Sequence, residues 1–186
     1  MTPDAILEHL KQKFGDALGD TEVKGVEVRM TVAAEHAWPV CRQLRDLGFE
    51  YLNCLSGVDW TTHLEVVYDV SSLHHPNKVH LRVKVSRQDP VVRTVTDIWQ
   101  AANWHERECY DLFGVRFDGH PDHRRILLPE DWVGYPLRKD YTDERLVPYT
   151  DYGMEEKVAK TEAAKGVAKE AKAPPAATPK PAAPTS

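Results

Sequence analysis

The sequence has 186 residues, of which 41% are hydrophobic, and a formal net charge of −5. This length suits one domain with an appendage, and the negative charge disfavours general nucleic-acid binding, which needs a basic surface. No stretch approaches the roughly 20 apolar residues that span a bilayer, and the acidic start lacks the order of a signal peptide, so we expect a cytoplasmic protein.

The first expected elements are a helix and a strand. Ile6, Leu10 and Phe14 recur at helical spacing, and Gly15 stands where this helix should end. Residues 26–30 alternate between apolar and polar side chains, which predicts a strand.

A second helix is predicted around residues 40–47, with Pro39 in its first turn and Gly48 at its end. Three strands are predicted next, over residues 49–55, 64–70 and 79–85. Their short polar connections favour antiparallel neighbours, and the one-sided alternation favours a sheet with one packed face and one face that is wet or covered by a partner. The expected fold class is α+β, with one sheet packed by helices.

Two further helices are expected before the periodicity ends. Thr94 with Asp97 three residues later resembles a capping box and predicts a helix that starts there. The same arrangement at Asn103 predicts a helix over residues 104–113, which Gly114 should end. We therefore place an α+β core domain at residues 1–114.

Residues 115–153 lack any hydrophobic period but are rich in proline, glycine, aromatic residues and charges of both signs. So long a connection is unusual inside a domain, yet its aromatic content is not that of a disordered chain. We interpret it as an extended interface segment that is ordered by lying on another protein. Residues 154–186 are almost entirely Ala, Lys, Glu, Pro and Thr, which predicts a low-complexity, disordered tail.

One dense stretch begins in the last predicted helix and reads ERECYDLFGVRFDGHPDHRRILLPEDWVGYPLRKDY, from Glu106 to Tyr141. Arg107 and Asp111 are four residues apart and can pair on one helix face, a contact worth only about 0.3–0.5 kcal/mol at a surface. Over some 36 positions, however, the stretch resembles the signature region of the C-type subunit of respiratory complex I, the 30 kDa subunit family. The residues that carry the resemblance are Glu106-Arg107-Glu108, Asp111, Leu112-Phe113, His120, Arg124 and Ile126-Leu127.

The resemblance implies a structural subunit of the peripheral arm of a proton-translocating NADH:quinone oxidoreductase. It implies that this chain packs on the larger D-type subunit, binds no cofactor, and has no catalytic residue of its own. FMN, iron–sulfur clusters and quinone are then expected in partner subunits, and membrane association, at the cytoplasmic side of the bacterial inner membrane, only through the complex. The equivalent subunit of a membrane-bound hydrogenase or related dehydrogenase is an open alternative.

The candidate interface consists of charged and aromatic residues that could set orientation on a complementary partner. These are Glu106, Arg107, Glu108, Asp111, His120, Arg124, Arg125, Trp132, Arg138, Lys139 and Asp140. Some of them could instead pair inside this chain, and the sequence leaves both possibilities open.

Other functional classes have weaker signals. His120-Pro-Asp-His123 is the best pattern for a stand-alone metal-dependent hydrolase, but there is no H-E-x-x-H or H-x-H pair. Cys41, Cys54 and Cys109 form no C-x-x-C, which disfavours a disulfide framework, a zinc site and an iron–sulfur site. No G-x-S-x-G motif and no glycine-rich phosphate loop is present. A free-standing peptide-binding module is the third interpretation.

Overall fold

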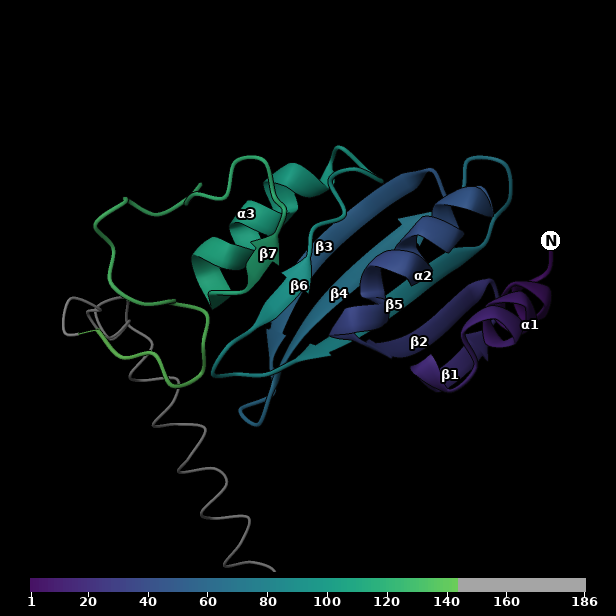
Figure 1. The fold of residues 1–186 in the computed structure, drawn as a ribbon, viewed down its shortest axis with the longest axis horizontal. Coiled ribbons are helices and arrows are strands. Elements are labelled where there is room, and N and C mark those ends of the chain that lie inside the picture. Colours follow the sequence, from purple (N-terminus) through teal and green to yellow (C-terminus); the bar gives the residue numbers. More distant parts are fainter. Residues whose placement is uncertain (144–186) are drawn as a thin grey trace, which may run out of the picture. The chain divides into compact units, whose positions relative to one another are not determined.

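A computed structural model describes residues 1–143 and contains a five-stranded sheet in the order β1-β2-β5-β4-β3 (Figure 1). The elements are α1 (Pro3–Phe14), a 3-10 turn (Gly15–Ala17), β1 (Leu18–Lys24), β2 (Glu27–Ala33), α2 (Ala34–Asp46), β3 (Tyr51–Asp59), β4 (Leu64–Ser71), β5 (Lys78–Val85), β6 (Val91–Arg93), α3 (Ala102–Phe113) and β7 (Arg116–Asp118). The predicted tail at 154–186, and the extended segment beyond residue 143, lie outside the described residues.

The first helix forms where its apolar period predicted it. Ile6 and Leu10 are fully buried, and the Thr2 hydroxyl accepts a hydrogen bond from the Ala5 N–H at the start of α1. The helix ends at Gly15, whose φ of 51° suits a residue without a Cβ. The amphipathic pattern therefore determines both the helix and its contact with the core.

The second helix begins earlier than expected, at Ala34, so Pro39 is its sixth residue and not part of the first turn as predicted. Proline has no N–H to donate to the carbonyl four residues back, so one helical hydrogen bond is missing there. The buried side of α2, which includes Val40 and Leu44, nevertheless holds it on the sheet. Gly48, with φ of 88°, follows the helix end as predicted.

The three consecutive strands are confirmed and pair antiparallel, β3 with β4 and β4 with β5. The first of them runs from Tyr51 to Asp59, so it starts and ends later than the predicted range of 49–55. β2 pairs parallel with β5, and β1, a strand that the sequence pattern did not predict, pairs antiparallel with β2. The β1 residues alternate poorly and include Gly19, which explains the omission. The fold class is α+β, as expected.

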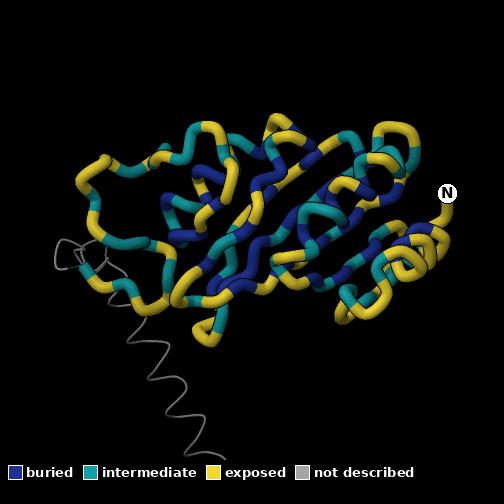
Figure 2. The backbone as a smooth tube through the Cα atoms, viewed as in Figure 1, coloured by how far each residue is buried: buried dark blue, intermediate teal, exposed yellow. Residues whose placement is uncertain are grey.

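One face of the sheet is packed and the other is open. In β5, buried Val79, Leu81 and Val83 alternate with outward-facing polar residues. α2 lies over the packed face, α1 packs beside it against β1 and β2, and α3 packs against β3 (Figure 1). Figure 2 shows the buried backbone concentrated along the central strands and the exposed backbone around the loops.

The prediction of a helix that starts at Thr94 is wrong. Residues 96–101 form turns, in which the N–H groups of Ile98 and Trp99 both donate to the Val95 carbonyl. The Thr94 hydroxyl donates to the buried Glu106 carboxylate and also accepts a hydrogen bond from the Thr96 N–H at 3.2 Å. The local contact expected at a helix start is therefore present, but the chain continues as turns and not as a helix.

The helix around residues 104–113 is confirmed as α3, but it starts at Ala102 without a side-chain cap, so the capping role predicted for Asn103 is also wrong. Gly114 ends the helix in a left-handed conformation, as predicted. Beyond it lies a feature that the sequence pattern did not predict, a two-stranded parallel sheet of β6 and β7. Buried Val92 and Phe117 hold these short strands.

Candidate partner-docking site

Three charged residues of α3 are buried: Glu106 and Asp111 have no exposed surface and Arg107 is 8% exposed. A buried charge needs hydrogen bonds or an opposite charge to offset its lost hydration. Each of the three finds its partners outside the helix, so α3 serves as an internal anchor.

Glu106 anchors the segment before the helix. Its Oε2 accepts from the Thr94 hydroxyl at 2.5 Å and its Oε1 accepts from the Val95 N–H at 2.8 Å. Burial raises the pKa of Glu106 to about 7, although these two hydrogen bonds favour the charged form. Glu106 therefore changes its protonation state close to neutral pH.

Arg107 anchors the segment that follows β7. Its guanidinium donates to the carbonyl oxygens of Arg124 at 3.1 Å and Arg125 at 2.9 Å, and lies 3.5 Å from the Asp122 carboxylate. The i, i+4 pair with Asp111 that the sequence allowed does not form. Arg107 instead holds the backbone of residues 124 and 125.

Asp111 anchors the same segment one turn further on. Its Oδ1 accepts from the Arg125 guanidinium at 2.7 Å. Its Oδ2 accepts from three consecutive N–H groups, those of Ile126, Leu127 and Leu128, at 3.1, 2.7 and 2.9 Å. Burial opposes ionisation, but these hydrogen bonds outweigh it and hold the pKa of Asp111 below its ordinary value.

Arg125 extends this contact outward. Its second guanidinium nitrogen donates to the carbonyl oxygens of Trp132 and Gly134, at 3.0 and 3.1 Å. The Asp111–Arg125 pair thus fixes the backbone on both sides of the turn at residues 126–134. An arginine paired with a carboxylate suits this role, because the planar guanidinium carries several N–H donors and can bind several carbonyl groups at once.

A second anchor holds the far end of the segment. The buried Asp59 at the end of β3 accepts from the Lys139 N–H at 2.8 Å and from the Arg87 guanidinium. Burial opposes ionisation here too, but these hydrogen bonds lower the pKa of Asp59 to about 2. Arg138 donates to the Phe113 carbonyl at 2.7 Å and lies over the Tyr135 ring. We call residues 119–142, held at both ends, the docking loop.

The docking loop turns apolar side chains outward. Leu127 is 62% exposed, Val133 is 78% exposed and Leu137 is 53% exposed. These residues were not among the predicted site residues, which were chosen for charge and aromatic rings. These residues could have been found from the sequence, because large apolar side chains in a stretch without hydrophobic periodicity do not belong to a helix or strand that faces the core.

The remaining predicted residues lie on the surface or beside the anchors. Glu108, Arg124, Lys139 and Asp140 are exposed, and Trp132 is half-buried. The His120 imidazole is buried, where its Nδ1 accepts from the Asp122 N–H and its Nε2 lies 3.1 Å from the Asn103 carbonyl oxygen. The interface role of all these residues stays a prediction.

Gly114 lets the docking loop approach α3. A Cβ at this position would overlap the Tyr135 ring, and its φ of 74° disfavours other residues. We expect Gly114→Ala to lower the free energy of unfolding by more than Gly119→Ala, which adds only backbone strain of about 1–2 kcal/mol. Denaturant unfolding of both variants measures the difference, and equal losses would show that Tyr135 moves away without cost.

Comparison with known proteins identifies the family. The sequence model of the family described as the 30 kDa subunit of respiratory-chain NADH dehydrogenase matches residues 30–145. The chain belongs to this family. The C-type subunit of NADH-quinone oxidoreductase from Chlorobium phaeobacteroides is 41% identical, over 74% of this chain and 87% of its own length. The equivalent protein of Chloroherpeton thalassium is 44% identical over 75% of this chain, which spans 63% of that relative.

Solved structures agree with the fold. A trypsin-resistant fragment of Nqo5 superposes with a TM-score of 0.57 and 31% identity, covering 66% of this chain and 99% of the fragment. A chain of an archaeal membrane-bound sulfane sulfur reductase, a respiratory membrane complex, gives a TM-score of 0.62 over 86% of this chain and 91% of its own. At 21% identity that likeness shows the fold alone. Within residues 1–143, no helix is long and apolar enough to cross a bilayer.

Proposed function

We propose that this member of the 30 kDa family is a cofactor-free scaffold subunit that docks on the D-type subunit of a proton-translocating NADH:quinone oxidoreductase. It would lie in the peripheral arm, at the cytoplasmic side of the bacterial inner membrane, with FMN, iron–sulfur clusters and quinone in its partners. Catalysis would then belong to the assembly and not to this chain. Family membership supports the assembly, and the docking loop supports the scaffold role.

The observation that carries the proposal is that charged residues hold the docking loop to the domain, while apolar residues of the loop are exposed to solvent. The chain uses Asp111, Arg125 and Asp59 to hold the loop in place, while Leu127 and Val133 remain exposed. A rigid loop with exposed apolar side chains binds with less loss of conformational entropy than a flexible one. Such side chains surrounded by charges are typical of an interface core and its rim.

The two adjacent arginines of the candidate interface differ in exposure, which decides which of them can be tested by charge reversal. Arg125 has a side chain that is 13% exposed and pairs with the buried Asp111, so its reversal would disrupt the docking loop itself. Arg124, whose side chain is 66% exposed, is the charge that can be reversed without this damage.

The test replaces the apolar side chains together, as Leu127→Ser, Val133→Ser and Leu137→Ser in one variant. Because buried interface anchors commonly contribute more than 1 kcal/mol each, we expect at least about tenfold less assembled complex in membrane extracts. Mass spectrometry of proteins that co-purify with the full chain measures the D-type subunit. The thermal melting of the isolated variant should match the wild type.

Leu73→Ser is the matched control, because Leu73 is 77% exposed and lies on the turn between β4 and β5. It should leave assembly unchanged. Normal assembly of the triple variant would refute docking through this loop, and turnover of a substrate by the purified chain would refute the scaffold role.

The hydrolase alternative gains no support from the geometry. His123 accepts from the Phe117 N–H at 3.0 Å, and His120 has backbone partners at both ring nitrogens. Among the described residues no three His, Cys, Asp or Glu side chains are grouped as metal ligands.

A further inference from the structure

The sheet has two edge strands, β1 and β3. Within residues 1–143, β3 pairs with β4 alone, through residues 51–59, so its outer edge has no neighbouring strand in this part of the chain. Within residues 1–143, no other hydrogen bond involves the backbone of Tyr51–Asp59. Alternate N–H and C=O groups along an edge strand point away from its neighbour, so this edge offers unused donors and acceptors.

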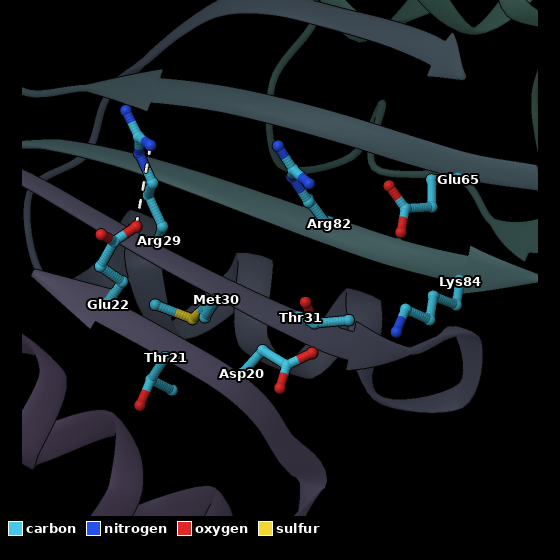
Figure 3. Close-up of a pocket in the computed structure, with 9 residues that line it drawn as sticks. All are labelled: Asp20, Thr21, Glu22, Arg29, Met30, Thr31, Glu65, Arg82 and Lys84. Atoms are coloured by element: carbon cyan, nitrogen blue, oxygen red, sulfur yellow. Dashed lines mark ion pairs between the residues drawn. The ribbon is translucent and has the colours of Figure 1, made fainter. Parts of the chain in front are cut away.

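The other edge is protected against strand pairing. β1 carries the charged residues Asp20, Glu22 and Lys24, and its register shifts between Gly19 and Glu22. Figure 3 shows the side chains of Asp20 and Glu22 on β1, among the residues that line a pocket on the open face of the sheet. Charges and bulges are the common means by which natural sheets prevent a further strand from adding.

β3 lacks the charged side chains that protect β1. It is nine residues long, and from Tyr51 to Val58 it contains no charged side chain and no proline. Its one irregularity is a register shift between Leu52 and Cys54, which leaves a regular stretch from Cys54 onward. A long, neutral, unpaired edge on an otherwise protected sheet indicates an edge that is kept for a partner.

The side chains on the open face of β3 would not obstruct a strand added along its edge. A Cβ on Gly57 would meet the Phe113 ring at 2.5 Å, so α3 presses on the packed face of the strand. Cys54 and Ser56 are exposed, and Tyr51 is 56% exposed. A strand added along this edge would continue the open face beside them.

We propose that the outer edge of β3, residues 51–58, accepts a short extended segment of a partner subunit as a sixth strand of the sheet. This rests on the proposed scaffold function, because it requires an assembly, but it uses a surface other than the docking loop. The backbone supplies the bonds, so the partner segment must be extended and free of proline at its paired positions. A partner is favoured over a second copy of this chain, since the register shift of a second β3 would interrupt the ladder again.

The first test measures amide hydrogen exchange of residues 51–58 in the isolated full chain and in the complex purified from membranes. An added strand should slow exchange of the outward amides by at least about tenfold. Cys54 provides an independent measurement, because Cys41 and Cys109 are buried and only Cys54 is exposed to a maleimide. Its labelling should slow in the complex as well. Unchanged exchange of residues 51–58 in the complex would overturn the proposal.

The second test places a charge on the edge. Ser56→Lys changes an exposed side chain, so the isolated variant should melt like the wild type while assembling at least about tenfold less. Thr21→Lys, on the edge that is already charged, is the control and should assemble normally. Normal assembly of Ser56→Lys would overturn the proposal.

The outcomes separate this proposal from the scaffold function. If the D-type subunit co-purifies but residues 51–58 exchange as fast as in the isolated chain, the docking function stands and the sixth strand is refuted. If residues 51–58 become protected in the isolated chain as dimers form, the occupant is a second copy and the partner assignment is refuted. Absence of any co-purifying subunit would refute both.

Discussion

Replacing Asp111 with alanine should lower the free energy of unfolding by about 3–5 kcal/mol, the usual cost of leaving one member of a buried ion pair without the other. The Arg125 guanidinium would lose its carboxylate, and the N–H groups of residues 126–128 would lose their acceptor. We also expect the docking loop to detach before the core unfolds, since the contacts of Asp111 with it are the ones removed. Denaturant unfolding of the full chain and limited proteolysis of residues 119–142 measure the two effects.

Asp131→Ala is the matched control, because Asp131 is an exposed carboxylate of the same loop. It should change stability by no more than about 0.5 kcal/mol. A double variant, Asp111→Leu with Arg125→Met, removes both charges and should recover part of the loss. If Asp111→Ala were as stable as Asp131→Ala, Asp111 would not be the anchor of the loop.

Stability should also fall as the pH rises toward neutrality, because of Glu106. Its pKa is about 7 in the folded chain, against 4.5 for the free side chain, so between these values the folded state holds a proton that the unfolded state has released. The stabilisation is complete below pH 4.5 and is lost as the pH rises through about 7. The pKa difference corresponds to about 3 kcal/mol.

Glu106→Gln should remove this dependence, because its amide oxygen can still accept from the Val95 N–H but cannot ionise. Unfolding free energies of the two proteins between about pH 4.5 and 8 provide the measurement. Burial lowers the pKa of His123, which gives a contribution of the opposite sign, so the informative quantity is the difference between the proteins. Glu108→Gln, on the exposed side of α3, should keep the wild-type slope, and a parallel pair of wild-type and Glu106→Gln curves would contradict the assignment.

The contacts of Asp111 also hold the docking loop in the position from which it would bind a partner. A loop held by Asp111, Arg125 and Asp59 presents Leu127 and Val133 in a fixed arrangement before a partner arrives. Pre-organisation of this kind reduces the entropy lost on association. A loss of stability at Asp111 should therefore also reduce assembly, although Asp111 itself has no exposed surface.

Prediction from the sequence was most accurate where structure depends on local periodicity. The helix around Ile6 and Leu10 and the strands at 64–70 and 79–85 follow from the spacing of apolar residues, which each element must bury on one side. Prediction failed after Thr94, where the chain forms turns and not a helix, and at the three-residue strands β6 and β7, which are too short to show a period.

For the candidate site, too, one part could be predicted from the sequence and another part could not. The ordered string from Glu106 to Tyr141 was enough to point to the family, and with it to an assembly, because so many residue types in one order are specific. Only the tertiary structure decided that Glu106, Arg107 and Asp111 work inside the chain while Leu127, Val133 and Leu137 stand outside it. The physical reason is that a charged side chain can be buried wherever distant backbone groups meet it, and residue order does not encode that meeting. It follows instead from the packing of α3 between the Thr94 turn and the docking loop.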